Sequence, residues 1–191
     1  ANIGETQGGF QDFATALNTS LNNIEAAYQS DGKLSGLPTA LDALDNKTGG
    51  LNNSYAVPSG GGDYTYNFRV ENGTVRIILG VIRSGKLSDK KGYTVDVYTS
   101  AEDTAPAVSA FGGEAMPEGL YSLPSTVVVP DGKTGGTFYL DIPVLAISRS
   151  EYAGKKLVLS VGIRNPSAYE LSDAATKTAV IVNVDALKAL L

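Results

Sequence analysis

Apolar and polar residues alternate along most of the chain after residue 60, and this two-residue period predicts β-strands. Clusters of turn-forming residues separate the alternating runs. The predicted strands cover residues 64–71, 74–83, 93–98, 126–129, 138–144, 157–163 and 180–184. About seven strands with almost no helical pattern between them predict a mainly β fold, an antiparallel immunoglobulin-like sandwich over residues 59–191.

The dipeptide Asn72-Gly73 lies between the first two predicted strands and predicts a two-residue hairpin turn. Such a turn fixes the register of the two strands, because residues at equal distances from it must pair. The pairs on one face are all apolar: Phe68 with Ile77, Val70 with Val75, and Tyr66 with Leu79. We therefore predict that this face of the hairpin packs into the core.

The other face of the hairpin places Arg69 directly opposite Arg76, with Glu71 diagonal to them. Like charges in this position are destabilising unless another group compensates them. One interpretation is an exposed Arg–Glu–Arg ladder. The other is a binding site for an anionic sugar or another carboxylate, which planar guanidinium groups bind well.

Residues 1–58 have a different pattern, in which apolar residues recur at steps of three and four. This spacing is typical of one face of a helix. The residues concerned are Phe10, Phe13, Leu17, Leu21, Ile24 and Tyr28. We predict a helix over residues 10–28 that packs on the sandwich or seals one of its open edges, within an N-terminal helical or irregular segment that ends at residue 58.

Two connections, residues 100–120 and 145–155, show no clear alternation and are predicted to be irregular. Binding residues often lie on such loops. Tyr98, Phe111 and Tyr121 lie on or beside the first connection, and aromatic side chains there can supply contact surface for a ligand. These three residues are therefore candidate ligand-binding residues, together with the two arginines of the hairpin.

The composition narrows the possible chemistry. The chain has no histidine and no cysteine, which removes the usual general base near neutral pH, thiolate nucleophiles and the commonest metal ligands. The net charge is −5 and the basic residues are scattered, so they form no basic stripe for nucleic acid. No pair of carboxylates stands out by its spacing. We predict a protein that is not an enzyme, uses no cofactor or metal and binds no nucleic acid.

Six segments share the succession and spacing of motifs of one family. They are Lys91–Val97, Tyr121–Pro124, Val127–Gly132, Leu157–Ile163, Asn165–Ser172 and Ala179–Val184. Over residues 64–185 the chain resembles a family of domains of unknown function from Bacteroides-type bacteria. The resemblance implies an immunoglobulin-like or Calx-beta-like sandwich. It also implies an outer-membrane lipoprotein of the cell envelope, anchored through a cysteine upstream of this chain and often encoded beside SusD-like glycan-uptake proteins.

The resemblance leaves several functions open. The leading hypothesis is a non-catalytic envelope module that binds a polysaccharide or assists its uptake. The alternatives are a structural or adhesive module that binds envelope proteins, and a glycan-active enzyme. Contact with the membrane is expected only through the upstream lipid anchor. The tripeptide Asp103-Thr104-Ala105 is similar to the acceptor sequence for protein O-glycosylation in such envelopes, which makes Thr104 a candidate modification site.

Overall fold

The computed structural model describes residues 33–35, 54–62, 65–84, 91–172 and 175–191, and all elements named below lie within these ranges. The strands are β1 (Lys33–Ser35), β2 (Ser54–Val57), β3 (Phe68–Glu71), β4 (Thr74–Arg83), β5 (Tyr93–Thr99), β6 (Glu114–Ala115), β7 (Thr126–Val129), β8 (Gly135–Pro143), β9 (Lys156–Arg164), β10 (Glu170–Leu171) and β11 (Lys177–Asn183). The helical elements are α3 (Ala101–Phe111), α4 (Val144–Ile147), α5 (Val184–Lys188) and the 3-10 turns η1 (Glu118–Leu120) and η2 (Ser150–Tyr152).

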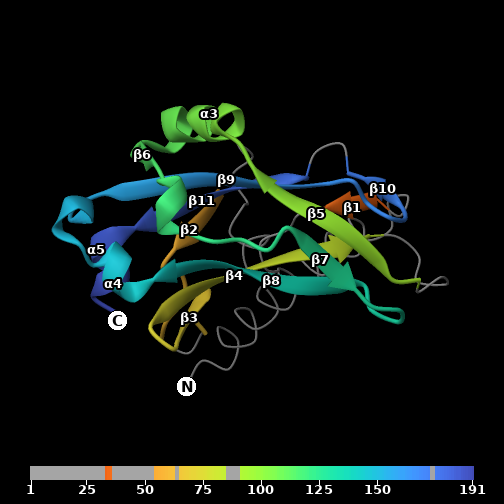
Figure 1. The fold of residues 1–191 in the computed structure, drawn as a ribbon, viewed down its shortest axis with the longest axis horizontal. Coiled ribbons are helices and arrows are strands. Elements are labelled where there is room, and N and C mark those ends of the chain that lie inside the picture. The colour runs from red at the N-terminus through yellow and green to blue at the C-terminus, as the bar shows by residue number, and fades with distance from the viewer. Residues whose placement is uncertain (1–32, 36–53, 63–64, 85–90, 173–174) are drawn as a thin grey trace, which may run out of the picture.

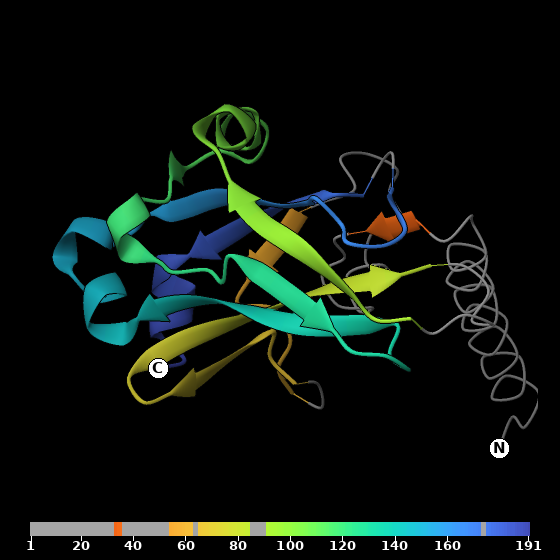
Figure 2. The same ribbon diagram turned by 45° about the vertical axis from the view of Figure 1, so that its right-hand side comes forward.

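Two β-sheets face each other and enclose the core (Figures 1 and 2). In the first sheet, β4 pairs with β8 on one side and with β3 and β1 on the other, and β10 pairs with β1. The second sheet has the order β2-β11-β9-β5-β7, and β6 also pairs with β9. β8 and β7 are therefore edge strands of different sheets, and they lie along the same side of the sandwich.

The alternation within β4 explains how this strand contributes to the core. Val75, Ile77, Leu79 and Val81 are buried, whereas the residues between them are partly exposed. Successive side chains of a strand point to opposite faces, so one face of β4 enters the core. β9 differs, because all residues from Leu157 to Ile163 are buried. One face of β9 lies in the core, and α3 packs on the other (Figure 1).

The predicted mainly β sandwich is confirmed, and each of the seven predicted strands is present, as β3, β4, β5, β7, β8, β9 and β11. The sheets are mixed rather than wholly antiparallel, because β1 with β10, β2 with β11 and β6 with β9 are parallel pairs. The strands outside the prediction (β1, β2, β6 and β10) have two to four residues each. Such short strands contain too few residues to show an alternating pattern.

The sandwich also begins earlier than the predicted boundary at residue 59. Tyr55 and Val57 of β2 are buried, and β2 pairs with β11 along its whole length. β1 lies further upstream still and belongs to the first sheet. The helix predicted over residues 10–28 lies outside the described residues.

The hairpin register predicted from Asn72-Gly73 is confirmed. The structure pairs Phe68 with Ile77, Arg69 with Arg76, and Val70 with Val75. Asn72 and Gly73 have φ values of 49° and 72°, as a primed two-residue turn requires.

Two details of the hairpin differ from the prediction. Val70 is 47% exposed, because β3 is short and pairs with no described strand other than β4. Tyr66 precedes β3 and does not pair with Leu79. The pairing ends instead with the hydrogen bond that the Ile78 amide donates to the Asn67 carbonyl at 3.0 Å. The apolar face of the hairpin therefore packs into the core only along part of its length.

Residues 100–120 are not an irregular loop, because they contain α3, β6 and η1. Ser100 caps α3: its Oγ accepts a hydrogen bond from the Asp103 amide at 3.1 Å and donates one to Asp103 Oδ2 at 2.8 Å. The helix has no apolar stripe, since Thr104 is its only buried residue, and Pro106 lies inside it. A helix without an apolar stripe and with an internal proline shows no helical periodicity, so the sequence pattern does not predict it.

The second connection, residues 145–155, contains the end of α4 and η2 and makes two short helical turns. Within the ranges that the structure describes, no helix combines the length and the apolar character needed to cross a membrane.

Candidate functional site

The three aromatic candidates do not meet on one surface. Tyr98 lies at the end of β5 on the outer face of its sheet, with the Arg164 guanidinium carbon 4.6 Å from its ring centroid. Phe111 is the last residue of the 11-residue helix α3, about 15 Å along the helix axis from its first residue, Ala101. Tyr121 packs against the core, with its hydroxyl 3.3 Å from Thr99 Oγ1. The 100–120 segment therefore does not assemble them into a stacking platform.

Thr104 is also placed differently from the expectation. Its side chain is only 4% exposed, and its Oγ1 accepts a hydrogen bond from the Ser160 amide at 3.2 Å. Ser160 lies on β9 between Val161, which pairs with β5, and Val158, which pairs with β6. Thr104 thus fills a gap in the strand pairing. A hydroxyl engaged in this way is not accessible to a glycosylating enzyme in the folded domain.

The two hairpin arginines form the Arg–Glu–Arg ladder, which is the first of the two interpretations of the sequence. Glu71 accepts from Arg69 Nη1 at 3.4 Å and from Arg76 Nη1 at 3.1 Å. The ladder continues onto β8, because Arg76 Nε donates to Asp141 Oδ1 at 3.0 Å and Arg69 Nη2 donates to the Tyr139 hydroxyl at 2.7 Å. Both guanidinium groups also lie over the Tyr139 ring, that of Arg76 at 4.0 Å from the centroid.

These contacts favour the ionised forms of Glu71 and Arg76. The hydrogen bond from Arg76 is the main cause that lowers the pKa of Glu71, and the positive charge of Arg69 adds to it. The hydrogen bonds to Asp141 and then to Glu71 raise the pKa of Arg76. The guanidinium groups are therefore used within the protein, and neither presents a free planar fork to an anion.

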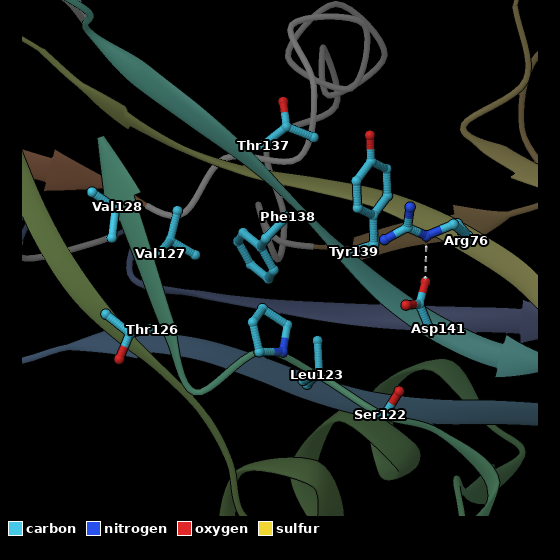
Figure 3. A pocket seen from close by; sticks show the side chains of 11 residues that line it. Arg76, Ser122, Leu123, Thr126, Val127, Val128, Thr137, Phe138, Tyr139 and Asp141 are labelled. Carbon is cyan, nitrogen blue, oxygen red and sulfur yellow. Dashed lines mark hydrogen bonds and ion pairs between the residues drawn. The ribbon is translucent and has the colours of Figure 1, made fainter. Parts of the chain in front are cut away.

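A groove of about 420 Å³ begins at this cluster and runs between β7 and β8 (Figure 3). This volume is at the lower end of the range typical of small-molecule sites, roughly 300–1,000 Å³. Phe138, Val127 and Leu123 form the apolar floor. The remaining lining residues are polar or lie on the rims: Arg76, Ser122, Pro124, Thr126, Val128, Thr137, Tyr139 and Asp141.

The wall of the groove on the β8 side is an unpaired strand edge. The Asp141 amide and carbonyl both bond to Ser122, at 3.0 and 2.9 Å, and so they point away from β4. Since backbone groups alternate in direction along an antiparallel strand, those of Tyr139 and Thr137 point the same way as those of Asp141. No other strand pairs with β8 at these two residues among those that the structure describes.

The wall on the β7 side has the same character. The Val97 amide donates to the Ser125 carbonyl at 2.9 Å, which shows that residue 125 faces β5. By the same alternation, the backbone groups of Thr126 and Val128 point away from β5 and toward β8. The groove is thus bounded by N–H and C=O groups of two strand edges that belong to different sheets.

Both ends of the groove are closed. At one end β8 approaches β7 closely: a Cβ atom on Gly136 would lie 3.2 Å from Val129 Cγ2. At the other end the two-bond bridge between Ser122 and Asp141 joins the strand edge to the 122–125 segment. The open stretch of edge is therefore only a few residues long, which suits a small ligand better than an extended peptide.

The groove carries a limited set of reactive groups. Its only carboxylate is Asp141, which is paired with Arg76, whereas glycoside hydrolysis ordinarily needs two carboxyl groups. Two acidic residues of the 100–120 segment are engaged in ion pairs outside the groove. Asp103 pairs with Lys177, and Glu114 accepts from Lys155 Nζ at 2.9 Å. In the described part of the chain, no group of acidic side chains is arranged to hold a metal ion.

Sequence reasoning identified Arg69 and Arg76 but missed the groove beside them. The alternation of residues 138–144 predicts a strand that contains Phe138, but it does not indicate which other strand lies beside the free edge of β8. The dipeptide Leu123-Pro124 is the one local feature that points to the groove. Proline has no backbone N–H, so it marks a segment that cannot continue the hydrogen bonding between strands.

Comparisons with known proteins bear on the fold. No family model matches the chain, and no curated protein matches it. A protein of unknown function from Bacteroides ovatus has a similar structure, with a TM-score of 0.52 and 15% identity over 79% of this chain and 45% of that chain. A two-domain protein with unknown function from Bacteroides fragilis has a TM-score of 0.50 and 10% identity over 80% of this chain and 45% of that chain.

A third similar structure is the apo form of the Calx CBD1 domain, with a TM-score of 0.45 and 11% identity over 80% of this chain and 96% of that domain. The chain spans less than half the length of the two Bacteroides proteins. At these identities the likeness to those two proteins shows a shared β-sandwich fold and leaves the ligand undefined.

Proposed function

We propose that this domain is a non-catalytic binding module that holds a small unit of a glycan in the groove between β7 and β8. The observation that carries the proposal is the pairing of an apolar floor with two walls of outward-facing backbone groups. A sugar ring has the matching character, since its C–H face is apolar and its hydroxyl rim donates and accepts hydrogen bonds. Tyr139 and the paired Arg76 and Asp141 supply a polar end.

Binding without chemical change is supported by the groups that line the groove. The single carboxylate, Asp141, accepts a hydrogen bond from Arg76 Nε at 3.0 Å, and no second carboxylate lines the groove. Two guanidinium groups lie over the Tyr139 ring, and the Tyr139 hydroxyl accepts a hydrogen bond from Arg69 Nη2 at 2.7 Å. The hydroxyl groups that line the groove need an adjacent general base to become nucleophiles, and the only carboxylate among the lining residues is already paired with Arg76.

An adhesive function is less well supported by the same geometry. A strand edge that recruits another protein chain is usually long and open along its length. Here the Ser122 bridge and the close approach at Gly136 limit the open edge at both ends. The groove therefore favours a compact ligand.

The proposal also places the module in the bacterial cell envelope, held by a lipid on a cysteine upstream of this chain. The support is the resemblance of residues 64–185 to envelope lipoproteins of Bacteroides-type bacteria. Labelling of the full-length protein with a fatty-acid analogue, followed by membrane fractionation, tests this placement. Recovery of unlabelled protein in the soluble fraction would contradict it.

A proline scan of the groove walls tests the proposed site. Thr137→Pro removes an amide that points into the groove without touching the bonds between β8 and β4, and edge strands tolerate proline. A glycan array first identifies a bound oligosaccharide, and NMR titration then gives its Kd. We expect Kd to rise about three- to tenfold, as for the loss of one hydrogen bond of about 0.5–1.5 kcal/mol.

Thr137→Ala is the matched control, because it removes the hydroxyl but keeps the amide, and its Kd should stay near that of the wild type. Thr126→Pro makes the same test on the β7 wall if Thr137→Pro does not fold. Unchanged affinity in both folded proline variants would place the ligand elsewhere. Product analysis of the same mixtures should show intact oligosaccharide, and cleavage by the pure protein would overturn the non-catalytic assignment.

A further inference from the structure

The charges around the groove lead to a conclusion about ligand class, which rests on the proposed function. We infer that the groove selects neutral sugar units and discriminates against acidic sugars such as uronic acids. This assignment differs from the anionic ligand that the two opposed arginines suggest in the sequence. The reason is that each positive charge at the groove is matched by a carboxylate of the protein.

Arg76 and Asp141 are the only charged residues among those that line the groove, so their formal charges sum to zero. Their salt bridge, from Nε to Oδ1, measures 3.0 Å. A second carboxylate, Glu71, lies 3.1 Å from Arg76 Nη1. A sugar carboxylate would therefore meet a guanidinium group that already has two anionic partners.

The other arginine does not change this balance. Arg69 does not line the groove, and its guanidinium donates to Glu71 and to the Tyr139 hydroxyl. An acidic ligand would have to displace one of these bonds or lie beside the Asp141 carboxylate without a cation of its own. Either arrangement costs free energy, because like charges repel and a charge without a partner is poorly solvated in a groove.

The groove walls favour hydroxyl groups for a separate reason. Each unpaired edge residue offers one N–H donor and one C=O acceptor. A hydroxyl group both donates and accepts, so it can satisfy either kind of backbone group. An ionised carboxylate only accepts, and it would leave the carbonyls of Thr137 and Tyr139 without a donor. The walls and the charge balance thus select for the same class of ligand.

Matched ligand pairs test this selectivity. Methyl glucoside and methyl glucuronoside differ at C6 alone, and methyl galactoside and methyl galacturonoside form a second such pair. NMR titration of the wild-type domain should give a Kd about tenfold or more lower for the neutral member of at least one pair. The titrations are run at two ionic strengths, because electrostatic discrimination weakens with added salt.

Two charge-neutralising variants locate the cause. Asp141→Asn removes the carboxylate that faces the groove, and leaves Arg76 with one anionic partner. We expect the uronoside to bind about tenfold more tightly to this variant than to the wild type, with the gain reduced at high salt. Glu71→Gln is the matched control, since it removes the same charge from the same arginine at a position outside the groove. Its preference for the neutral sugar should remain, and thermal melting of both variants verifies that they fold.

The outcomes separate the two proposals. If the wild-type domain binds the uronoside as tightly as the neutral glycoside, or more tightly, the selectivity is wrong and glycan binding stands. If Asp141→Asn folds and gains no affinity for the uronoside, the charge balance is not the cause of the selectivity. If neither member of either pair binds, and the oligosaccharide array is also negative, the proposed function itself fails.

Discussion

At the scale of single residues, Arg83 is the least expected feature of the core. It continues the buried face of β4, where the four preceding core positions are aliphatic, and it is only 3% exposed. Its Nε and Nη2 atoms have no hydrogen-bond partner among the residues that the structure describes. The guanidinium carbon lies 4.7 Å from the Tyr169 ring centroid, which compensates part of the cost of burial. The same enclosed surroundings raise the pKa of Tyr93 to about 12, mainly through burial.

Replacing this arginine should stabilise the fold. No ion pair of Arg83 occurs within the described part of the chain, and replacing buried ionic groups by apolar side chains of similar volume can raise stability by about 1–4 kcal/mol. We expect Arg83→Met to raise the melting temperature in differential scanning calorimetry. Arg164→Met is the matched control, because Arg164 lies over Tyr98 at a similar distance, 4.6 Å, but is exposed. Arg164→Met should change the free energy of unfolding by no more than about 0.5 kcal/mol. A lower melting temperature for Arg83→Met would show that the buried guanidinium makes a net favourable contribution.

At the scale of elements, periodicity identifies strands that have a buried and an exposed face and misses elements without one. The β3–β4 hairpin could be predicted to its register, because alternation and the Asn72-Gly73 turn specify the same pairing. α3 could not be predicted, since its only buried residue is Thr104. Its position depends on the Ser100 cap and on the gap in β9 that Thr104 fills, and neither is visible in hydropathy.

The hairpin turn should be sensitive to Gly73 for conformational reasons alone. Gly73 has a φ of 72°, and a Cβ atom there would have nothing within 4 Å. A β-branched residue adopts positive φ with difficulty, so Gly73→Val should destabilise the domain by about 1–3 kcal/mol in urea unfolding. Gly119→Val is the control, because the space around Gly119 is equally open but its φ is not positive. Equal losses in the two variants would show that the turn conformation is not the cause.

Asp103, which is bonded to Ser100 and Lys177 at the start of α3, should make the free energy of unfolding depend on pH in the acid range. The hydrogen bond from Lys177 is the main cause that lowers the pKa of Asp103 below its ordinary value of 3.8, with Ser100 also contributing. A carboxylate whose pKa is lowered on folding stabilises the fold above its unfolded pKa, and this stabilisation is lost as pH decreases through the folded pKa. Asp103→Asn should therefore be less stable than the wild type at pH 6–7, by at most about 1 kcal/mol for this partly exposed pair.

This difference should shrink as pH falls below about 4, where the wild-type carboxylate takes up a proton. Urea unfolding at several pH values measures it. Lys177→Met completes a double-mutant cycle, and the double variant should lose little beyond either single variant. If the free energies of unfolding of Asp103→Asn and the wild type differ by the same amount down to pH 2, the charge of Asp103 does not contribute to the difference.

At the scale of the whole molecule, the site depends on how the two sheets are placed. The sequence predicts β7 and β8 as strands, and it also indicates the Arg–Glu–Arg ladder of Arg69, Glu71 and Arg76. Nothing in the local pattern indicates that the free edges of these strands face each other, because that depends on which strand occupies the end of each sheet. The ion pair between Arg76 and Asp141 likewise follows from the pairing of β4 with β8, 65 residues apart in the chain.

The same arrangement limits how much of the two adjacent strand edges is open to pairing with another chain. Open edges can pair with other chains, and proteins usually keep such edges short or covered. Here Ser122 covers β8 at Asp141, and the approach of Gly136 to β7 closes the other end. Only the stretch that forms the groove stays open. The features that limit edge pairing therefore also give the groove its closed ends.

Hydrogen exchange followed by NMR can test this picture of the groove along β8 residue by residue. The amides of Phe138 and Leu140 bond to β4 and should exchange slowly, whereas those of Thr137 and Tyr139 point into the groove and should exchange fast. Asp141 should be slow although it points the same way as Tyr139, because its amide donates to the Ser122 carbonyl at 3.0 Å. Saturation with a bound oligosaccharide should slow Thr137 and Tyr139 and leave Phe138 and Leu140 unchanged. Uniform protection along β8 in the free domain would contradict an open edge, and an unchanged pattern on saturation would place the ligand outside the groove.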